Sequence, residues 1–101
     1  MAAQVTNPLE KLLAAAKEAQ PQEPEVWLFA GRYAIESGRC PAAAADFQKA
    51  TSLSPRDAAA FASLGIARLC LGDRTGAREA FLRSLNLDPD QPRVRQYLGR
   101  I

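Results

Sequence analysis

Residues with the chemistry for catalysis or metal binding are scarce in this sequence. It contains no histidine for general acid–base work, no Gly-x-Gly-x-x-Gly or Gly-Lys-Ser/Thr phosphate loop, and no nucleophile beside a plausible base. Its two cysteines, Cys40 and Cys70, suggest neither a zinc ligand set nor a disulfide framework, and we expect both to be reduced. We therefore expect no enzymatic activity, no catalytic residue, no metal and no cofactor. Recognition by a binding surface is the chemistry that remains.

The composition indicates that helices must position such a surface. The 101 residues are 48% hydrophobic, 7% aromatic and 24% charged. Ala and Leu supply most of the apolar residues, where β-branched residues would favour strands, so we expect an all-α fold. The formal net charge of +2 is too small for a strong nucleic-acid or membrane signal. From Arg68 onward, seven arginines against four acids leave +3, which we interpret as solvated helix faces or, alternatively, as a contact with an acidic partner.

The sequence carries no signal for a membrane or for export. Its N-terminal segment has no basic start, and the apolar run 12–16 is closed off by Lys11 and Lys17, which is not the pattern of a signal peptide. No stretch approaches the roughly 18 apolar residues that span a bilayer. We therefore expect a cytoplasmic location and no membrane partner.

The most informative pattern is an internal repeat. A shift of 34 residues superimposes six identical pairs and one aromatic pair without a gap: Gly31 on Gly65, Gly38 on Gly72, Ala43 on Ala77, Phe47 on Phe81, Leu53 on Leu87, Pro55 on Pro89 and Trp27 on Phe61. We expect the four aromatic residues among them to lie in the core. Gly31 and Gly65 fall inside helices, where we expect them to let Ala43 and Ala77 approach the backbone closely.

Each repeat unit contains residues typical of the beginnings and ends of two helices. Glycines at 38 and 72 can take the left-handed conformation that ends a helix, and a proline at 41 suits the first turn of the next helix. Asp57 and Asp73 can cap the helices of the second unit. These signals predict helices over residues 25–37, 41–53, 58–71 and 74–87, each pair forming an A helix and a B helix.

These residues resemble the tetratricopeptide repeat (TPR) pattern of W-x2-L-G-x2-Y, A-x3-F and P. The first copy is Trp27, Ala30, Gly31, Ala34, Ala43, Phe47, Ala50 and Pro55, and the second is Phe61, Leu64, Gly65, Arg68, Ala77, Phe81, Ser84 and Pro89. Departures occur at Ala30, Ala34 and Arg68, and Tyr33 sits one place early. The resemblance implies a short right-handed α-solenoid of antiparallel helix pairs, a TPR superhelix.

Partial repeats continue the same register on both sides. Asn7, Pro8 and Glu10 form a capping-box-like start for a half-repeat helix over residues 8–19. Leu98 and Gly99 match Leu64 and Gly65, which predicts a C-terminal capping helix within 92–101. We therefore expect one domain over 1–101 with repeats at 24–57 and 58–91 and five to six helices in all.

The TPR resemblance implies that A helices line a concave groove that binds a segment of another protein. The positions that match the family's groove are Leu28, Phe29, Arg32, Ile35, Ala62, Ser63, Ile66, Leu69, Arg93, Tyr97 and Arg100. The lysine and asparagine of the family's carboxylate clamp are missing there, so an amphipathic helix or extended apolar peptide fits better. Arg32 is expected either to anchor a partner carboxylate or to pair with Glu36. Leu28, Ile66 and Leu69 are expected either in the groove or in packing against neighbouring helices.

The expected function is a non-enzymatic protein-interaction module acting as adaptor or chaperone. In size and binding mode it is similar to the small TPR chaperones of type III secretion, although no residue singles out that subgroup. A self-associating scaffold is one alternative, since apolar faces and short end caps could meet a second copy. An RNA-binding helical repeat is a weaker one, because the aromatic residues are assigned to the core.

Overall fold

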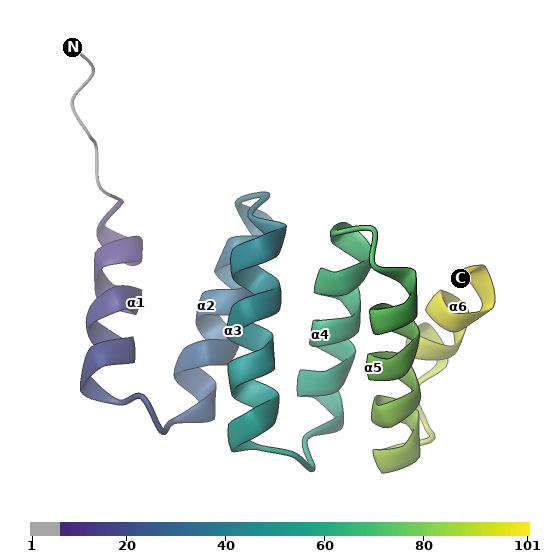
Figure 1. Ribbon diagram of the computed structural model, residues 1–101. Helices are drawn as coiled ribbons and strands as arrows, with labels where there is room; N and C mark the ends of the chain where they lie inside the picture. The colour runs from purple at the N-terminus through teal and green to yellow at the C-terminus, as the bar shows by residue number, and fades with distance from the viewer. Residues whose placement is uncertain (1–6) are drawn as a thin grey trace.

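The computed structural model describes residues 7–101, and these form six helices arranged in one row (Figure 1). The helices are α1 (Pro8–Ala19), α2 (Pro24–Glu36), α3 (Cys40–Leu53), α4 (Ala58–Cys70), α5 (Arg74–Leu87) and α6 (Pro92–Arg100). Neighbouring helices are antiparallel, α2 packs closely on α3 and α4 on α5, and no strand occurs within the described residues. The all-α solenoid fold predicted from the sequence is confirmed. Within 7–101, no helix combines the length and apolar character needed to cross a bilayer.

The helix ends follow local physical signals. The side chain of Asp57 accepts a hydrogen bond from the Ala60 N–H at 3.2 Å, and that of Asp73 accepts one from the Gly76 N–H at 2.9 Å. Gly38 and Gly72 have φ angles of 75° and 81°, a conformation that ends α2 and α4 without strain. Two helices begin one residue earlier than expected. Helix α2 begins at Pro24, where residue 25 was expected, and α3 begins at Cys40, where Pro41 was expected.

The core is built where a phenylalanine of each B helix fits against a glycine of its A helix. A Cβ atom on Gly31 would lie 2.6 Å from the Phe47 ring, and one on Gly65 would lie 2.5 Å from the Phe81 ring. The close approach expected at both glycines is present, and the nearest atoms to each missing Cβ belong to the phenylalanine ring. Ala43 and Ala77 are fully buried. The phenylalanine ring one turn further along each B helix occupies the space that a Cβ atom on the glycine would take.

Two of the four aromatic residues assigned to the core are only half-buried. Phe47 and Phe81 are 2% and 0% exposed, as expected, whereas Trp27 and Phe61 are half-buried. Cationic side chains cover their rings: Nζ of Lys17 lies 4.9 Å from the Trp27 ring centroid, and the Arg83 guanidinium lies 5.2 Å from that of Phe61. The core assignment is therefore wrong for these two, whose rings are half-buried and contacted by cationic side chains.

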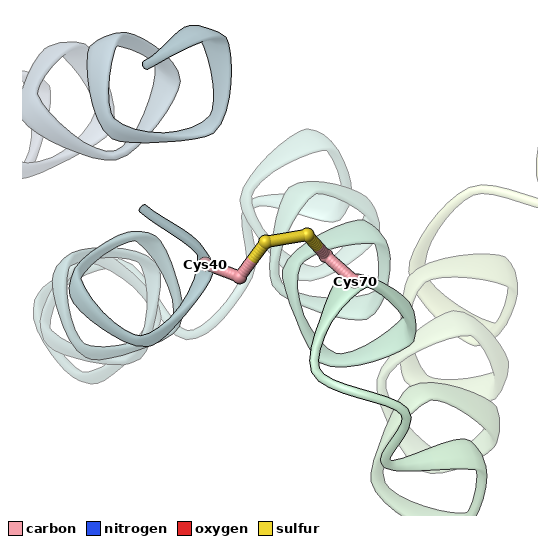
Figure 2. Close-up of a disulfide and its surroundings, with 2 residues drawn as sticks. All are labelled: Cys40 and Cys70. Carbon is pink, nitrogen blue, oxygen red and sulfur yellow. A yellow bond between two sulfur atoms is a disulfide. The ribbon is translucent and has the colours of Figure 1, made fainter. Parts of the chain in front are cut away.

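A disulfide joins the two cysteines in this structure (Figure 2). Cys40 is the first residue of α3 and Cys70 the last of α4, and their Cα atoms lie 5.8 Å apart, a separation that a bridge spans. The expectation that both are reduced is therefore wrong for the structure. Their 30-residue spacing gave no sign of pairing, because antiparallel packing of α3 and α4 is what brings the start of one beside the end of the other.

Helix α1 is attached to the following helices mainly by polar contacts. None of its residues is buried. The Tyr33 hydroxyl accepts a hydrogen bond from the Asn7 amide at 2.8 Å and donates one to Glu10 at 3.2 Å. Glu10 also pairs with Arg39 at 2.8 Å, and Lys17 of α1 pairs with a buried aspartate of α3, also at 2.8 Å. The tyrosine that sits one place early in the repeat pattern thus fastens α1.

Candidate functional site

The candidate site is a cleft between the A helices α2 and α4, referred to below as the α2–α4 cleft. It has a volume of about 150 Å³ and is lined by Arg32, Ile35, Glu36, Phe47, Ser63 and Ile66. Phe47 is 2% exposed, so its ring forms the floor, and the two isoleucines are half-buried in the walls. The cleft therefore combines an apolar interior with one cation and one anion.

The repeat positions the cleft residues. Ile35 and Ile66 lie on successive A helices, and α3 packs against both of those helices. Phe47 reaches the floor because Gly31 leaves room for its ring beside α2. Ser63 is the small residue that keeps the α4 side open, since it stands at the repeat position that Phe29 occupies in α2.

The structure brings four of the sequence-predicted groove residues together around this cleft: Arg32, Ile35, Ser63 and Ile66. Phe29 lies one turn before Arg32 and is 64% exposed. These two residues line an adjoining depression of about 370 Å³ together with Leu9 of α1 and Glu36. The apolar surface therefore continues from the cleft towards α1.

The other predicted groove residues are divided between packing and open surface. Leu28 packs on the core around Phe47, while Ala62, Leu69 and Tyr97 pack on the core around Phe81. The Tyr97 ring stacks on Phe81 with a centroid distance of 5.3 Å and an interplanar angle of 5°. Arg93 and Arg100 are exposed on α6, and neither lines the α2–α4 cleft. Packing is thus one role that the structure shows for Leu28 and Leu69.

The charges at the mouth of the cleft do not pair with each other. Within residues 7–101 the ion pairs are Lys17–Asp46 and Glu10–Arg39, and no pair joins Arg32 to Glu36. Both side chains are exposed at the surface. The guanidinium of Arg32 is therefore available to a carboxylate from outside the chain, and the expected i,i+4 pair is not formed in the structure.

Sequence reasoning missed the part that Phe47 plays at this site. It was expected only in the core, yet the same ring closes the bottom of the cleft. A signal was present, since Gly31 removes the Cβ that would otherwise stand between the B-helix ring and the A-helix face. Among the described residues, no group of His, Cys, Asp or Glu side chains is placed to hold a metal ion.

Comparison with known proteins supports the repeat assignment. No family model matches the sequence. Superkiller complex protein 3 of Mus musculus is 35% identical over 81 residues, which cover 73% of this chain but only 5% of that protein. A solved structure of the first TPR of Spaghetti (RPAP3), bound to the HSP90 peptide SRMEEVD, is similar with a TM-score of 0.85. That likeness covers 89% of this chain and 71% of the other at 20% sequence identity, so it bears on the fold.

The paired helices, the glycine–phenylalanine contacts and the 34-residue period define a class of helical repeat proteins. The repeat pattern and the fold of this chain are those of tetratricopeptide repeat proteins. The chain has two full helix pairs, α2–α3 and α4–α5, with one further helix on each side.

Proposed function

We propose that this chain is a non-enzymatic TPR module that binds a segment of another protein in the α2–α4 cleft, as an adaptor or chaperone. The observation that carries the proposal is the apolar cleft itself, with Ile35 and Ile66 half-buried above the Phe47 ring. Arg32 lies at its mouth and forms no ion pair with any residue from 7 to 101. An amphipathic helix or extended peptide would place an apolar side chain in the cleft. Arg32 would then bind a neighbouring carboxylate of the ligand by paired hydrogen bonds.

The size of the cleft supports a side chain as occupant. Sites for drug-sized molecules and cofactors usually occupy about 300–1,000 Å³. The α2–α4 cleft has about 150 Å³, which suits a single anchoring side chain. The adjoining depression beside Phe29 extends the surface along which the rest of a peptide would lie.

The proposed ligand differs from the acidic peptide in the RPAP3 structure. A carboxylate clamp of the TPR family uses lysine, asparagine and arginine on A helices, and the matching positions here are Leu28, Arg32, Ser63, Arg93 and Tyr97. Arg32 and Arg93 can donate charged hydrogen bonds. Tyr97, however, is stacked on Phe81, and Leu28 is packed on the core. We therefore propose recognition led by an apolar anchor, with a single ion pair at its side.

A peptide selection tests this function. Peptides selected from a random library on the wild-type chain would be labelled, and their affinities measured by fluorescence anisotropy. We expect Ile66→Glu to weaken binding about 30-fold, since it replaces roughly 2 kcal/mol of apolar burial with a charge. Arg32→Ala tests the proposed ion pair between Arg32 and a carboxylate of the ligand, and it leaves the core unchanged. Leu82→Glu is the matched control, because Leu82 is a helical leucine of α5 that is 53% exposed and does not line the cleft.

The outcomes separate the competing functions. If Ile66→Glu and Leu82→Glu weaken peptide binding equally, the α2–α4 cleft is not the binding site. Circular dichroism of each variant distinguishes a loss of binding from a loss of folding. A peptide held by an apolar anchor should bind with little dependence on salt. A tenfold or larger loss of affinity between low and physiological salt would favour a polyanion instead, and the RNA-binding alternative with it.

The proposed cytoplasmic location is tested by the redox state of the cysteines. Disulfides persist in oxidising compartments and are rare in the cytosol, so the Cys40–Cys70 bridge bears directly on this proposal. Alkylation of the protein in freshly lysed source cells would count its free thiols. Two free thiols support the cytoplasm, and a fully bridged population points to an oxidising compartment.

A further inference from the structure

The disulfide between Cys40 and Cys70 lies at the junction between the two full repeats. Cys40 begins α3 and Cys70 ends α4, so the bridge joins the first repeat to the second (Figure 2). In the 34-residue register, Arg74 stands at the position of Cys40, and Glu36 stands at that of Cys70. The bridge is therefore an addition to the repeat pattern at this one junction.

The same junction contains the α2–α4 cleft. Neighbouring helices are antiparallel, so α2 and α4 run in the same direction and end on the same side of the row (Figure 1). Glu36, which lines the cleft, is the last residue of α2 and precedes Cys40 by four residues. Ile66, which lines the opposite wall, lies one helical turn before Cys70 on α4. The bridge is thus at the end of the junction where both walls of the cleft end.

The spacing of the two walls is set through α3. Helix α3 packs closely on both α2 and α4, whereas α2 and α4 have few direct contacts with each other. The chain itself joins α3 to α4 by the turn at residues 54–57, which is at the other end of both helices. At the cleft end, the bridge is the covalent link between α3 and α4, with 5.8 Å between the two Cα atoms. Opening it leaves the last turn of α4 held by noncovalent packing alone.

A cleft of this size depends on the distance between its walls. Its volume of about 150 Å³ suits a single side chain, which must touch both walls at once. Dispersion attraction falls steeply when one side of such a contact opens, even by less than the width of an atom. Walls that are fixed before binding also spare the ligand the entropy cost of ordering them. The closed bridge should therefore favour binding in the cleft.

The bridge is accessible to a reductant from solvent. Cys70 is exposed and Cys40 is half-buried. A small thiol such as glutathione, acting as a thiolate, can attack Sγ of Cys70, which forms a mixed disulfide and releases the Cys40 thiolate to take up a proton. A second thiolate then attacks the small-molecule sulfur of the mixed disulfide and releases Cys70, which is protonated in turn. Two electrons and two protons pass to the protein, two thiols become one small disulfide, and the reverse exchange restores the bridge.

We propose that the Cys40–Cys70 bridge is a redox switch for the α2–α4 cleft, which binds its peptide tightly when the bridge is closed and weakly when a small thiol has opened it. This inference rests on the proposed peptide binding in the cleft and adds its regulation. Coupling between two sites is reciprocal, so a bound peptide must favour the bridged form by the same factor by which the bridge favours the peptide.

Affinity in the two redox states tests the switch. A labelled peptide selected on the bridged wild-type chain would be titrated by fluorescence anisotropy before and after reduction with dithiothreitol. We expect reduction to weaken binding about tenfold. The double variant with Cys40→Ser and Cys70→Ser cannot form the bridge, so it should bind like the reduced wild type and should not respond to dithiothreitol. Circular dichroism should show that the bridged, reduced and double-variant chains are all helical.

The reciprocal measurement separates a switch from a merely structural disulfide. The wild-type chain would be equilibrated in buffers of fixed glutathione ratio with and without saturating peptide, and its free thiols counted by alkylation and mass spectrometry. We expect the peptide to raise the ratio of bridged to reduced chains by the same factor of about ten. A bridge that only staples the fold at a distance from the site would give the same ratio with and without peptide.

The outcomes distinguish failure of the switch from failure of peptide binding. Equal affinity in both redox states overturns the switch, and the proposed function stands where Ile66→Glu still weakens binding. Tighter binding after reduction also overturns it, as does a glutathione equilibrium that the peptide leaves unchanged. A reduced chain without helices overturns it too, because the bridge would then hold the fold rather than the cleft. If Ile66→Glu binds like the wild type in both states, the cleft is not the site, and the proposed function and the switch fail together.

Discussion

Replacing Gly65 with alanine should destabilise the protein even though alanine is the better helix former. Gly65 lies in the middle of α4. A Cβ atom there would stand 2.5 Å from Cε1, 2.6 Å from Cδ1 and 2.9 Å from Cζ of Phe81. The ring is fully buried and its face is stacked on Tyr97, so it has little room to move aside.

Two opposing terms decide the size of the effect. Alanine in place of glycine inside a helix contributes about 1 kcal/mol of stability. Forcing an extra carbon into a packed core costs about 1–3 kcal/mol, and this site belongs at the upper end because the contact is with a fixed ring. We expect a net loss of roughly 1–2 kcal/mol, which corresponds to a fall in Tm of about 5–15 °C for a domain of this size.

Urea unfolding followed by circular dichroism measures this loss. Gly99→Ala is the matched control, because its Cβ would meet nothing within 4 Å and so should not lower the stability. In a Phe81→Leu background the ring is gone, and Gly65→Ala should then be neutral or stabilising, a difference that a double-mutant cycle isolates. A single variant Gly65→Ala as stable as the wild type would refute the packing argument.

Three further predictions concern the links between helices. Reducing the Cys40–Cys70 bridge should lower the free energy of unfolding by about 3–4 kcal/mol, because it frees a 30-residue loop in the unfolded chain; urea midpoints with and without reductant measure this. Ser84→Ala should cost about 1–2 kcal/mol in thermal melts, since it removes a buried 2.7 Å hydrogen bond to the Ala58 carbonyl. Tyr33→Phe should speed amide exchange in α1 and leave α4 and α5 unchanged, and equal exchange throughout would contradict the docking role of its hydroxyl.

The fold could be predicted from the sequence because the residues that begin and end each helix act locally. A glycine that can take positive φ ends α2 and α4, and aspartates cap α4 and α5, as the residues at 38, 72, 57 and 73 indicated. Periodicity then fixed which helices pair. The α2–α4 cleft follows from the same register, because the period of 34 places Ile66 of α4 at the position of Arg32 in α2, one turn before Ile35.

Features that depend on distances between helices could not be predicted from the sequence. The sequence shows a glycine and two candidate neighbours on the B helix, and only the packing decides that Phe47 rather than Ala43 fills the space. The disulfide depends on how α3 and α4 lie beside each other. The half-exposure of Trp27 depends on Lys17 of α1 and Lys49 of α3, which lie over its ring. In each case the missing information was geometry between elements.

The central claim is that a partner segment binds the α2–α4 cleft, and an amide-resolved NMR titration tests it most directly. A selected peptide would be added to ¹⁵N-labelled protein, and the shifted resonances mapped along the chain. We predict that the largest shifts fall on Arg32, Ile35, Ser63 and Ile66, with smaller ones at Phe29. Largest shifts on the B helices α3 and α5, with the cleft unchanged, would contradict the account.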